Sequence, residues 1–260
     1  MSHMSHNPPG GEPTEGYVVF PDLHGQYELA ARALENYDLG TVTPIFAGDF
    51  IDIGPDSAKL VGLIRTAQAE GAVALTGNHE WVCRNALAED TDPMVAEWRD
   101  FIWPGYESGL LESYGMERTG NRQHDAEQLS ERMTAAGDLE FIQNELLTSF
   151  ETDDFVVVHA GPEPDRPWAA QREALERAAG PAERLGEEPR QIFDHALAMP
   201  AAIPESVDRR CFVTGHVHLS ESASERRVGN RICLASRLDA GQPLYVWESR
   251  PDRIVEITQA

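Results

Sequence analysis

Residues 44–55 have the sequence PIFAGDFIDIGP, and this stretch decides the fold. Its first four residues form a short apolar run, which predicts a buried strand. A glycine and Asp49 follow at once, Asp52 comes three positions later, and an amphipathic pattern over Ser57–Glu70 predicts a helix. A strand that ends in carboxylates and then passes into a helix is the repeating unit of an α/β sheet.

The same arrangement recurs along the chain. Helices are predicted at Tyr27–Asn36 and after Asn78. Strands are predicted at Tyr17–Phe20, Pro44–Ala47, Ala72–Leu75, Phe155–Val158, Cys211–Thr214, Arg231–Ala235, Leu244–Glu248 and Ile254–Thr258. The first three strands alternate with helices, which indicates parallel strands joined by right-handed crossovers. The last three are separated by turn residues, so the C-terminal third is expected to be β-rich.

Two polar stretches interrupt this pattern and predict helical insertions, at about 85–151 and 162–208. Aromatic residues gather at Trp98–Tyr106, where they would pack in a core or cap the site and stack on a nucleobase. Residues 1–16 are expected to form a flexible lead without the features of a secretory signal. Residues 17–260 are expected to form a single domain.

Composition narrows the function. The 260 residues include 21 basic and 44 acidic ones, a formal net charge of −23. This balance argues against nucleic-acid binding by a basic surface and against docking on an anionic membrane. No apolar run is long enough for a membrane span. The acidity indicates a solvated surface or a halophilic host. Three cysteines without CxxC spacing argue against disulfides and a thiolate zinc site, which favours the cytoplasm.

Polar side chains follow five of the predicted strands. Strand C-termini share one edge of an α/β sheet, so these side chains are expected to converge. They are Asp22, His24, Asp49, Asp52, Asn78, His79, His159, His216 and His218. Oxygen and imidazole donors without cysteine suit Mn²⁺, Fe²⁺ or Zn²⁺. Their number exceeds the needs of one ion and fits two ions about 3.5 Å apart that share a carboxylate.

The motifs that carry these residues resemble those of the calcineurin-like metallophosphoesterase superfamily. They are DLHG at 22–25, GDFIDIGP at 48–55, GNHE at 77–80, HAG at 159–161 and GHVH at 215–218. The longer forms are most similar to the phosphoprotein-phosphatase branch, which contains bacterial serine/threonine phosphatases and symmetric diadenosine tetraphosphatases. The resemblance implies a four-layer αββα sandwich with two central mixed sheets and helical insertions.

The resemblance also implies roles for the converging residues. Two divalent metal ions would be bound, Mn²⁺ first among them, with Fe or Zn as alternatives. The first ion would be held by Asp22, His24 and His218, and the second by Asn78, His159 and His216. Asp49 would bridge the two ions. His79 would protonate the leaving oxygen while water held by the metals attacks phosphorus, and Asp52 would orient His79.

Two positions depart from the family pattern. Pro21 stands where the family usually has glycine, which removes no ligand. Ile53 stands where the branch usually has an arginine that grips the substrate phosphate, a contact that an apolar side chain cannot make. Arg84 and Arg237 are the candidate replacements, and each could equally be a surface arginine.

Three functions follow from these observations. The first is hydrolysis of a phosphomonoester, on a small molecule or a protein. The second is hydrolysis of a dinucleoside polyphosphate or a phosphodiester, which the isoleucine at position 53 favours. The third is a non-catalytic metal-binding protein that has kept the site. The sequence leaves the substrate, the native metal pair and the oligomeric state open.

Overall fold

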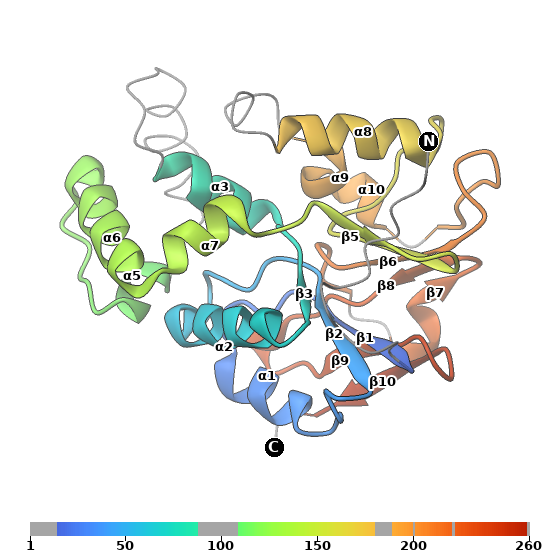
Figure 1. The fold of residues 1–260 in the computed structure, drawn as a ribbon, viewed down its shortest axis with the longest axis horizontal. Coiled ribbons are helices and arrows are strands. Elements are labelled where there is room, and N and C mark those ends of the chain that lie inside the picture. The colour runs from blue at the N-terminus through green and yellow to red at the C-terminus, as the bar shows by residue number, and fades with distance from the viewer. Residues whose placement is uncertain (1–14, 88–108, 180–188, 200, 220–221, 259–260) are drawn as a thin grey trace.

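The computed structural model describes residues 15–87, 109–179, 189–199, 201–219 and 222–258 (Figure 1). Within these ranges, two five-stranded sheets lie at the centre and helices lie outside them. None of the helices in these ranges is both long enough and apolar enough to span a bilayer.

The first sheet has the strand order β10-β9-β1-β2-β3 and is mixed. Strands β1 (Gly16–Phe20), β2 (Val42–Phe46) and β3 (Val73–Ala74) are parallel. β9 (Leu244–Glu248) joins β1 antiparallel and carries β10 (Arg253–Ile257) at the edge. Strands from the two ends of the chain therefore share this sheet.

The second sheet has the order β4-β5-β6-β8-β7. Its three inner strands are parallel, namely β5 (Phe155–Val158), β6 (Cys211–Thr214) and β8 (Arg231–Cys233). The two edge strands, β4 (Ser149–Glu151) and β7 (Arg227–Val228), pair antiparallel with them. This sheet is mixed as well.

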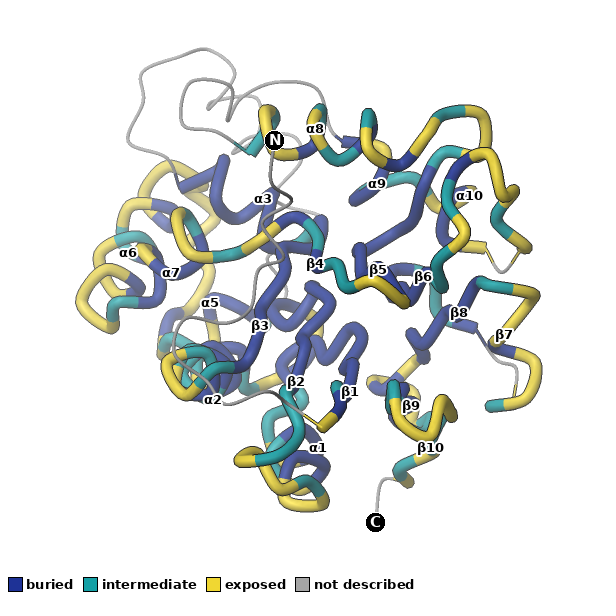
Figure 2. The backbone as a smooth tube through the Cα atoms, turned by 45° about the vertical axis from the view of Figure 1, so that its right-hand side comes forward, coloured by how far each residue is buried: buried dark blue, intermediate teal, exposed yellow. Residues whose placement is uncertain are grey.

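The two sheets pack against each other through alternate residues of their strands. One apolar cluster contains Val19 and Ile45 of the first sheet together with Val157 and Val213 of the second. Their neighbours along the strands, such as Val18, belong to a different cluster with helical residues. Successive side chains of a strand point to opposite faces, so this division places one core between the sheets. Figure 2 shows the central strands as almost wholly buried.

Helices cover the outer face of each sheet (Figure 1). α1 (Tyr27–Leu34) and α2 (Ser57–Ala69) pack in the core outside the first sheet, and α8 (Trp168–Ala178) and α9 (Arg190–Phe193) outside the second. The further helices are α3 (Asn78–Ala86), α5 (Leu110–Ser113), α6 (Arg122–Ala136), α7 (Asp138–Asn144) and α10 (His195–Ala198). The expected helix–sheet–sheet–helix sandwich is confirmed.

The sequence-based elements need local corrections. The stretch 85–151 was expected to be helical, yet it ends in strand β4, and β7 was not predicted at all. The strands expected at Ala72–Leu75 and Arg231–Ala235 are shorter, and β1 begins one residue earlier than expected. Residues 98–106 lie outside the described ranges. The single-domain organisation stays a prediction.

Candidate metal centre

The side chains predicted to converge do so, at the ends of strands from both sheets. Asp22 and His24 follow β1, and Asp49 follows β2. Asn78 and His79 open helix α3 directly after β3. His159 follows β5, and His216 and His218 follow β6. The C-terminal ends of the parallel strands therefore meet where the two sheets adjoin.

The side chains form three sets of possible metal ligands. Within each set, the ligand atoms lie within 4.8 Å of one another. One set is Asp22, His24 and His218, and another is Asp49, His159 and His216. The third joins His24 and His79 to Asp49, so it links the first two sets. The first set is the one that the resemblance assigned to the first ion, and the second set holds His159 and His216 of the second ion together with Asp49, the expected bridge.

The histidine rings present bare nitrogens to this centre. His159 Nδ1 lies 2.8 Å from the Ala47 carbonyl oxygen, and His24 Nδ1 lies 3.0 Å from that of Ile51. A carbonyl oxygen only accepts, so each Nδ1 carries a proton, and in the neutral ring each Nε2 has a lone pair. His216 has the opposite tautomer, because its Nε2 donates to the Phe193 carbonyl oxygen at 3.1 Å.

These lone pairs face other acceptors. His159 Nε2 lies 3.1 Å from His216 Nδ1, 3.0 Å from Asn78 Oδ1 and 3.2 Å from Asp49 Oδ2. The buried Nε2 of His218 has no hydrogen-bond partner within the described ranges and lies 3.8 Å from Asp22 Oδ2. Acceptors that meet without hydrogens between them need a cation or a proton. The donor set therefore fits divalent metal ions.

The pKa values of the buried groups reflect this competition. Burial lowers the pKa of His24 and of His216 to about 3, so both rings are neutral at pH 7. Burial acts the same way on His159, but the charge of Asp49 outweighs it and raises the pKa of His159 to about 9. In the metal-free protein a proton therefore occupies the place next to Asp49 that a cation could take.

His79 differs from the other rings because its Nδ1 is bound to a carboxylate. It lies 2.8 Å from Asp52 Oδ2, while Nε2 points toward Asp49 Oδ2 at 3.9 Å. Burial lowers the pKa of His79, but the charges of Asp49 and Asp52 outweigh burial and raise it to about 9. The ring is thus protonated at neutral pH.

Several of these residues have left-handed backbone conformations. The φ angles are 40° at His24, 53° at Asp49, 66° at Asp52 and 68° at His216. Such conformations cost on the order of 1–3 kcal/mol for residues other than glycine and persist where the surroundings impose them. Here the backbone N–H of His24 donates to the Asp49 carbonyl oxygen, and that of His216 donates to the Asp22 carboxylate.

Glu80 imposes the conformation at Asp49, a role that was not assigned from the sequence. Its carboxylate is fully buried and accepts four backbone N–H groups. Oε2 accepts those of Asp49 and Gly77 at 2.7 and 2.9 Å. Oε1 accepts those of Phe50 and Ile51 at 2.9 and 3.2 Å. The GNHE spacing was a signal for this role, since it places a carboxylate in the first turn of a helix beside the loop.

Gly77 and Gly215 precede candidate ligands, and a carboxylate lies so close to each that a larger residue would not fit. A Cβ at Gly77 would collide with the carboxylate of Asp49, and one at Gly215 would collide with that of Asp22. Side-chain-free positions here let the backbone pass directly behind the ligand carboxylates.

The positions singled out for substrate contact lie differently. Ile53 is 40% exposed and has a φ of 61°, rare for a β-branched residue. Arg84 is only 6% exposed, with its guanidinium 4.0 Å from the centre of the Trp81 ring. Arg237 is exposed and pairs with Asp239 through Nη2 at 2.6 Å.

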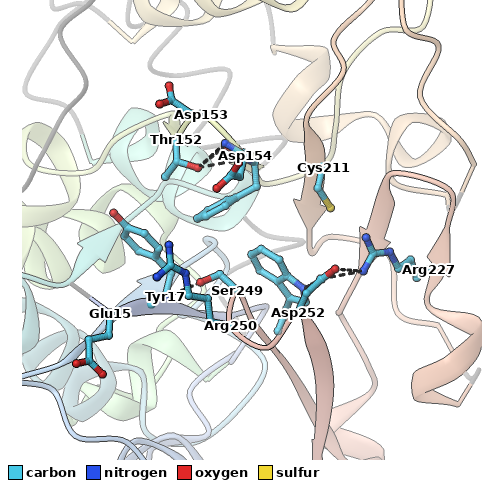
Figure 3. A pocket seen from close by; sticks show the side chains of 13 residues that line it. Glu15, Tyr17, Thr152, Asp153, Asp154, Cys211, Arg227, Ser249, Arg250 and Asp252 are labelled. Carbon is cyan, nitrogen blue, oxygen red and sulfur yellow. Dashed lines mark hydrogen bonds and ion pairs between the residues drawn. The ribbon is translucent and has the colours of Figure 1, made fainter. Parts of the chain in front are cut away.

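A cavity of 510 Å³ lies at the opposite end of the sheets, where the parallel strands begin (Figure 3). Gly16, Phe155 and Cys211, which begin β1, β5 and β6, are in its lining. Arg227 and Asp252 form an ion pair at its rim, with 2.8 Å between Nη1 and Oδ1. It contains none of the converging residues and is therefore separate from the candidate centre.

Comparisons with known proteins agree with this fold. Among solved structures, a candidate diadenosine tetraphosphatase superposes with a TM-score of 0.56 at 17% identity, with 96% of each chain covered. A serine/threonine phosphatase from Saccharomyces cerevisiae gives 0.54 at 15% identity, with 96% of this chain and 81% of that one covered. A search of the curated proteins gives no match. The profile of the calcineurin-like phosphoesterases matches residues 17–219, so the chain belongs to that family and is a hydrolase.

Proposed function

We propose that the chain hydrolyses a phosphomonoester with the help of two divalent metal ions. The observation that carries the proposal is the convergence of two sets of ligand atoms that share the neighbourhood of Asp49. The first ion would be held by Asp22, His24 and His218 and the second by Asn78, His159 and His216, with Asp49 between them. Phosphorylated small molecules or proteins are the corresponding substrates.

Divalent ions at these ligands would polarise the phosphoryl oxygens and lower the pKa of a nearby water. The chain itself supplies the proton for the leaving oxygen. His79 holds it at Nε2, and the hydrogen bond from Nδ1 to Asp52 fixes the ring and favours the protonated form. General acids contribute about 10²–10⁴-fold to a rate. Asp52 is therefore proposed as the residue that orients His79.

Manganese is the first metal to test, with iron and zinc as alternatives, because the ligands are oxygen and imidazole donors. We also propose a cytoplasmic location. It is supported by the three free thiols, Cys83, Cys211 and Cys233, which a reducing compartment would preserve.

A second candidate function is hydrolysis of a phosphoric anhydride such as a dinucleoside polyphosphate. The observation that favours it is Ile53, an exposed apolar side chain one residue after Asp52. An apolar contact beside the centre suits a substrate that extends beyond a single phosphate better than it suits a free phosphoryl group.

The test is an assay of Mn²⁺-loaded protein with p-nitrophenyl phosphate, its bis ester and diadenosine tetraphosphate. We expect turnover that chelation abolishes, and the preferred compound separates the two candidates. Asp49→Asn should remove turnover of every compound, whereas Asp153→Asn, at an exposed site, should behave as the parent. Equal activity in Asp49→Asn would contradict both functions.

A further inference from the structure

The second helical insertion contacts the candidate centre at the junction of α9 and α10. The Phe193 carbonyl oxygen accepts His216 Nε2 at 3.1 Å, and the next residues are Asp194 and His195. The ring of His195 lies against that of His216, with 4.6 Å between the ring centres. Although it is next to a candidate ligand, His195 is exposed.

The junction is held by a hydrogen bond to the loop after β5 and by two contacts of its own Asp194. The Gln191 carbonyl oxygen accepts the N–H of Ala160, directly after His159, at 2.8 Å. The Asp194 carboxylate accepts the N–H of Ala196 at 2.8 Å and pairs with Arg190 at 2.6 Å. The position of His195 at the rim is therefore set by the fold and not by its own polar contacts.

Within the described residues, no hydrogen bond to the ring nitrogens of His195 is found, and its ring lies against that of His216. In either tautomer, a neutral imidazole keeps one N–H donor. Arg84 and Arg237, the arginines considered for substrate contact, and Arg190 of the junction already have partners. Arg84 stacks on Trp81, Arg190 pairs with Asp194, and Arg237 pairs with Asp239. An anion that extends past the second ligand set would therefore meet the donor of His195.

We propose that His195 binds the substrate, by donating a hydrogen bond to an anionic group next to the phosphorus under attack. The chemistry it fits is the neighbouring phosphate of a phosphoric anhydride. This inference rests on hydrolysis at the proposed metal centre and, within it, on the second candidate function, the cleavage of a phosphoric anhydride. His195 contributes to specificity and holds no metal.

The experiment measures binding as well as turnover. Calorimetry with Mn²⁺ in excess compares inorganic triphosphate with orthophosphate on the parent and on His195→Ala. A hydrogen bond to a charged group contributes about 1.5–3 kcal/mol, so we expect triphosphate to bind at least about tenfold more weakly. Orthophosphate binding and metal content should stay unchanged. His195→Gln, which keeps an N–H donor, should recover part of the loss.

The matched control is His124→Ala, which removes another exposed histidine, on helix α6. It should bind both anions as the parent does. Equal weakening of both anions in His195→Ala, or no weakening of either, would overturn the proposal. In turnover, KM should rise about tenfold for diadenosine tetraphosphate and not for p-nitrophenyl phosphate. A parent that hydrolyses neither compound would refute the proposed function, while calorimetry would still decide the role of His195.

Discussion

Each buried histidine of the centre uses one ring nitrogen to hold its position and leaves the other for the site. Nδ1 of His24 and of His159 donates to a backbone carbonyl oxygen, and Nε2 of His216 does the same. The tautomers are therefore determined by the backbone of neighbouring loops. His79 is anchored instead by the carboxylate of Asp52, and this difference is the reason for proposing it as the proton donor.

The change His79→Asn tests that assignment. Asparagine cannot donate a proton to the leaving oxygen, so we expect kcat to fall by about 10²–10⁴-fold. The fall should be smallest for substrates with good leaving groups such as p-nitrophenolate. Metal content, measured by elemental analysis, should equal that of the parent. Loss of metal in the variant would show that His79 is a ligand.

Glu80→Gln is the second prediction at this scale. Whichever oxygen the amide nitrogen replaces, two backbone N–H groups lose their acceptor inside the protein. Buried unsatisfied groups cost about 1–3 kcal/mol, so the free energy of unfolding should fall by at least that amount. Mn²⁺ affinity should fall too, because Glu80 holds the backbone of Asp49. Urea unfolding and Mn²⁺ titration measure both.

Glu140→Gln is the matched control for this change, since Glu140 is exposed on α7. It should alter neither stability nor metal affinity. A Glu80→Gln protein that is destabilised yet binds Mn²⁺ as tightly as the parent would show that Glu80 supports the fold without positioning Asp49.

At the scale of elements, the strands followed by ligand motifs were predictable from the sequence. Apolar runs such as Phe155–Val158 match their strands residue for residue, because they are buried on both faces and bounded by polar residues. The edge strands of the second sheet were not predictable. β4 and β7 have three and two residues, too few to show an alternation of apolar and polar positions. Their conformation comes from pairing with β5 and β8.

The candidate site likewise contains residues that were predictable from the sequence and one, His195, that was not. Its candidate ligands were predictable because each stands shortly after a strand or in the first turn of a helix. His195 was not, since it lies within an insertion, far along the chain from the HAG motif before it and the GHVH motif after it. The contact of its ring with His216 depends on how α9 and α10 pack on the second sheet. Such packing has no signature in local sequence.

The end of β8 is joined to the loop after His218 by a buried arginine. Arg226 donates through Nη2 to the Leu219 carbonyl oxygen at 2.8 Å and through Nη1 to that of Ala235 at 2.8 Å. Its guanidinium also stacks on the Tyr245 ring at 3.8 Å. A forked donor is needed to reach both carbonyl groups, and lysine has only one nitrogen.

Arg226→Lys should therefore lower the free energy of unfolding by about 1–3 kcal/mol, because a buried carbonyl group loses its donor. It should also weaken Mn²⁺ binding, since Leu219 follows His218. Arg227→Lys is the control, because Arg227 is exposed and its ion pair with Asp252 contributes about 0–1 kcal/mol. Equal stability changes in the two variants, measured by urea unfolding, would refute the role of Arg226.

At the scale of the whole molecule, the centre joins the two sheets. Asp22 and Asp49 follow strands of the first sheet, while His159 and His216 follow strands of the second. A cation bound by Asp49 of the first sheet and by His159 and His216 of the second would therefore link the halves of the sandwich. Ligands that bind only the folded state stabilise it, by about 2.7 kcal/mol at one hundred times the dissociation constant. The melting temperature should fall on chelation.

The size of that fall should depend on pH. In the metal-free protein, His79 and His159 have pKa values raised to about 9, above the ordinary 6.5. The folded state then binds more protons than the unfolded state between pH 6.5 and 9. This contribution to stability is complete below pH 6.5 and is lost as the pH rises through 9.

Bound Mn²⁺ should take the place of the proton on His159 and so reduce the loss of stability with rising pH. Melting temperatures of chelated and Mn²⁺-loaded protein from pH 6.5 to 9 measure the effect, and we expect the gap between them to widen with pH. A gap that narrows across this range would mean that the cation does not replace the proton beside Asp49.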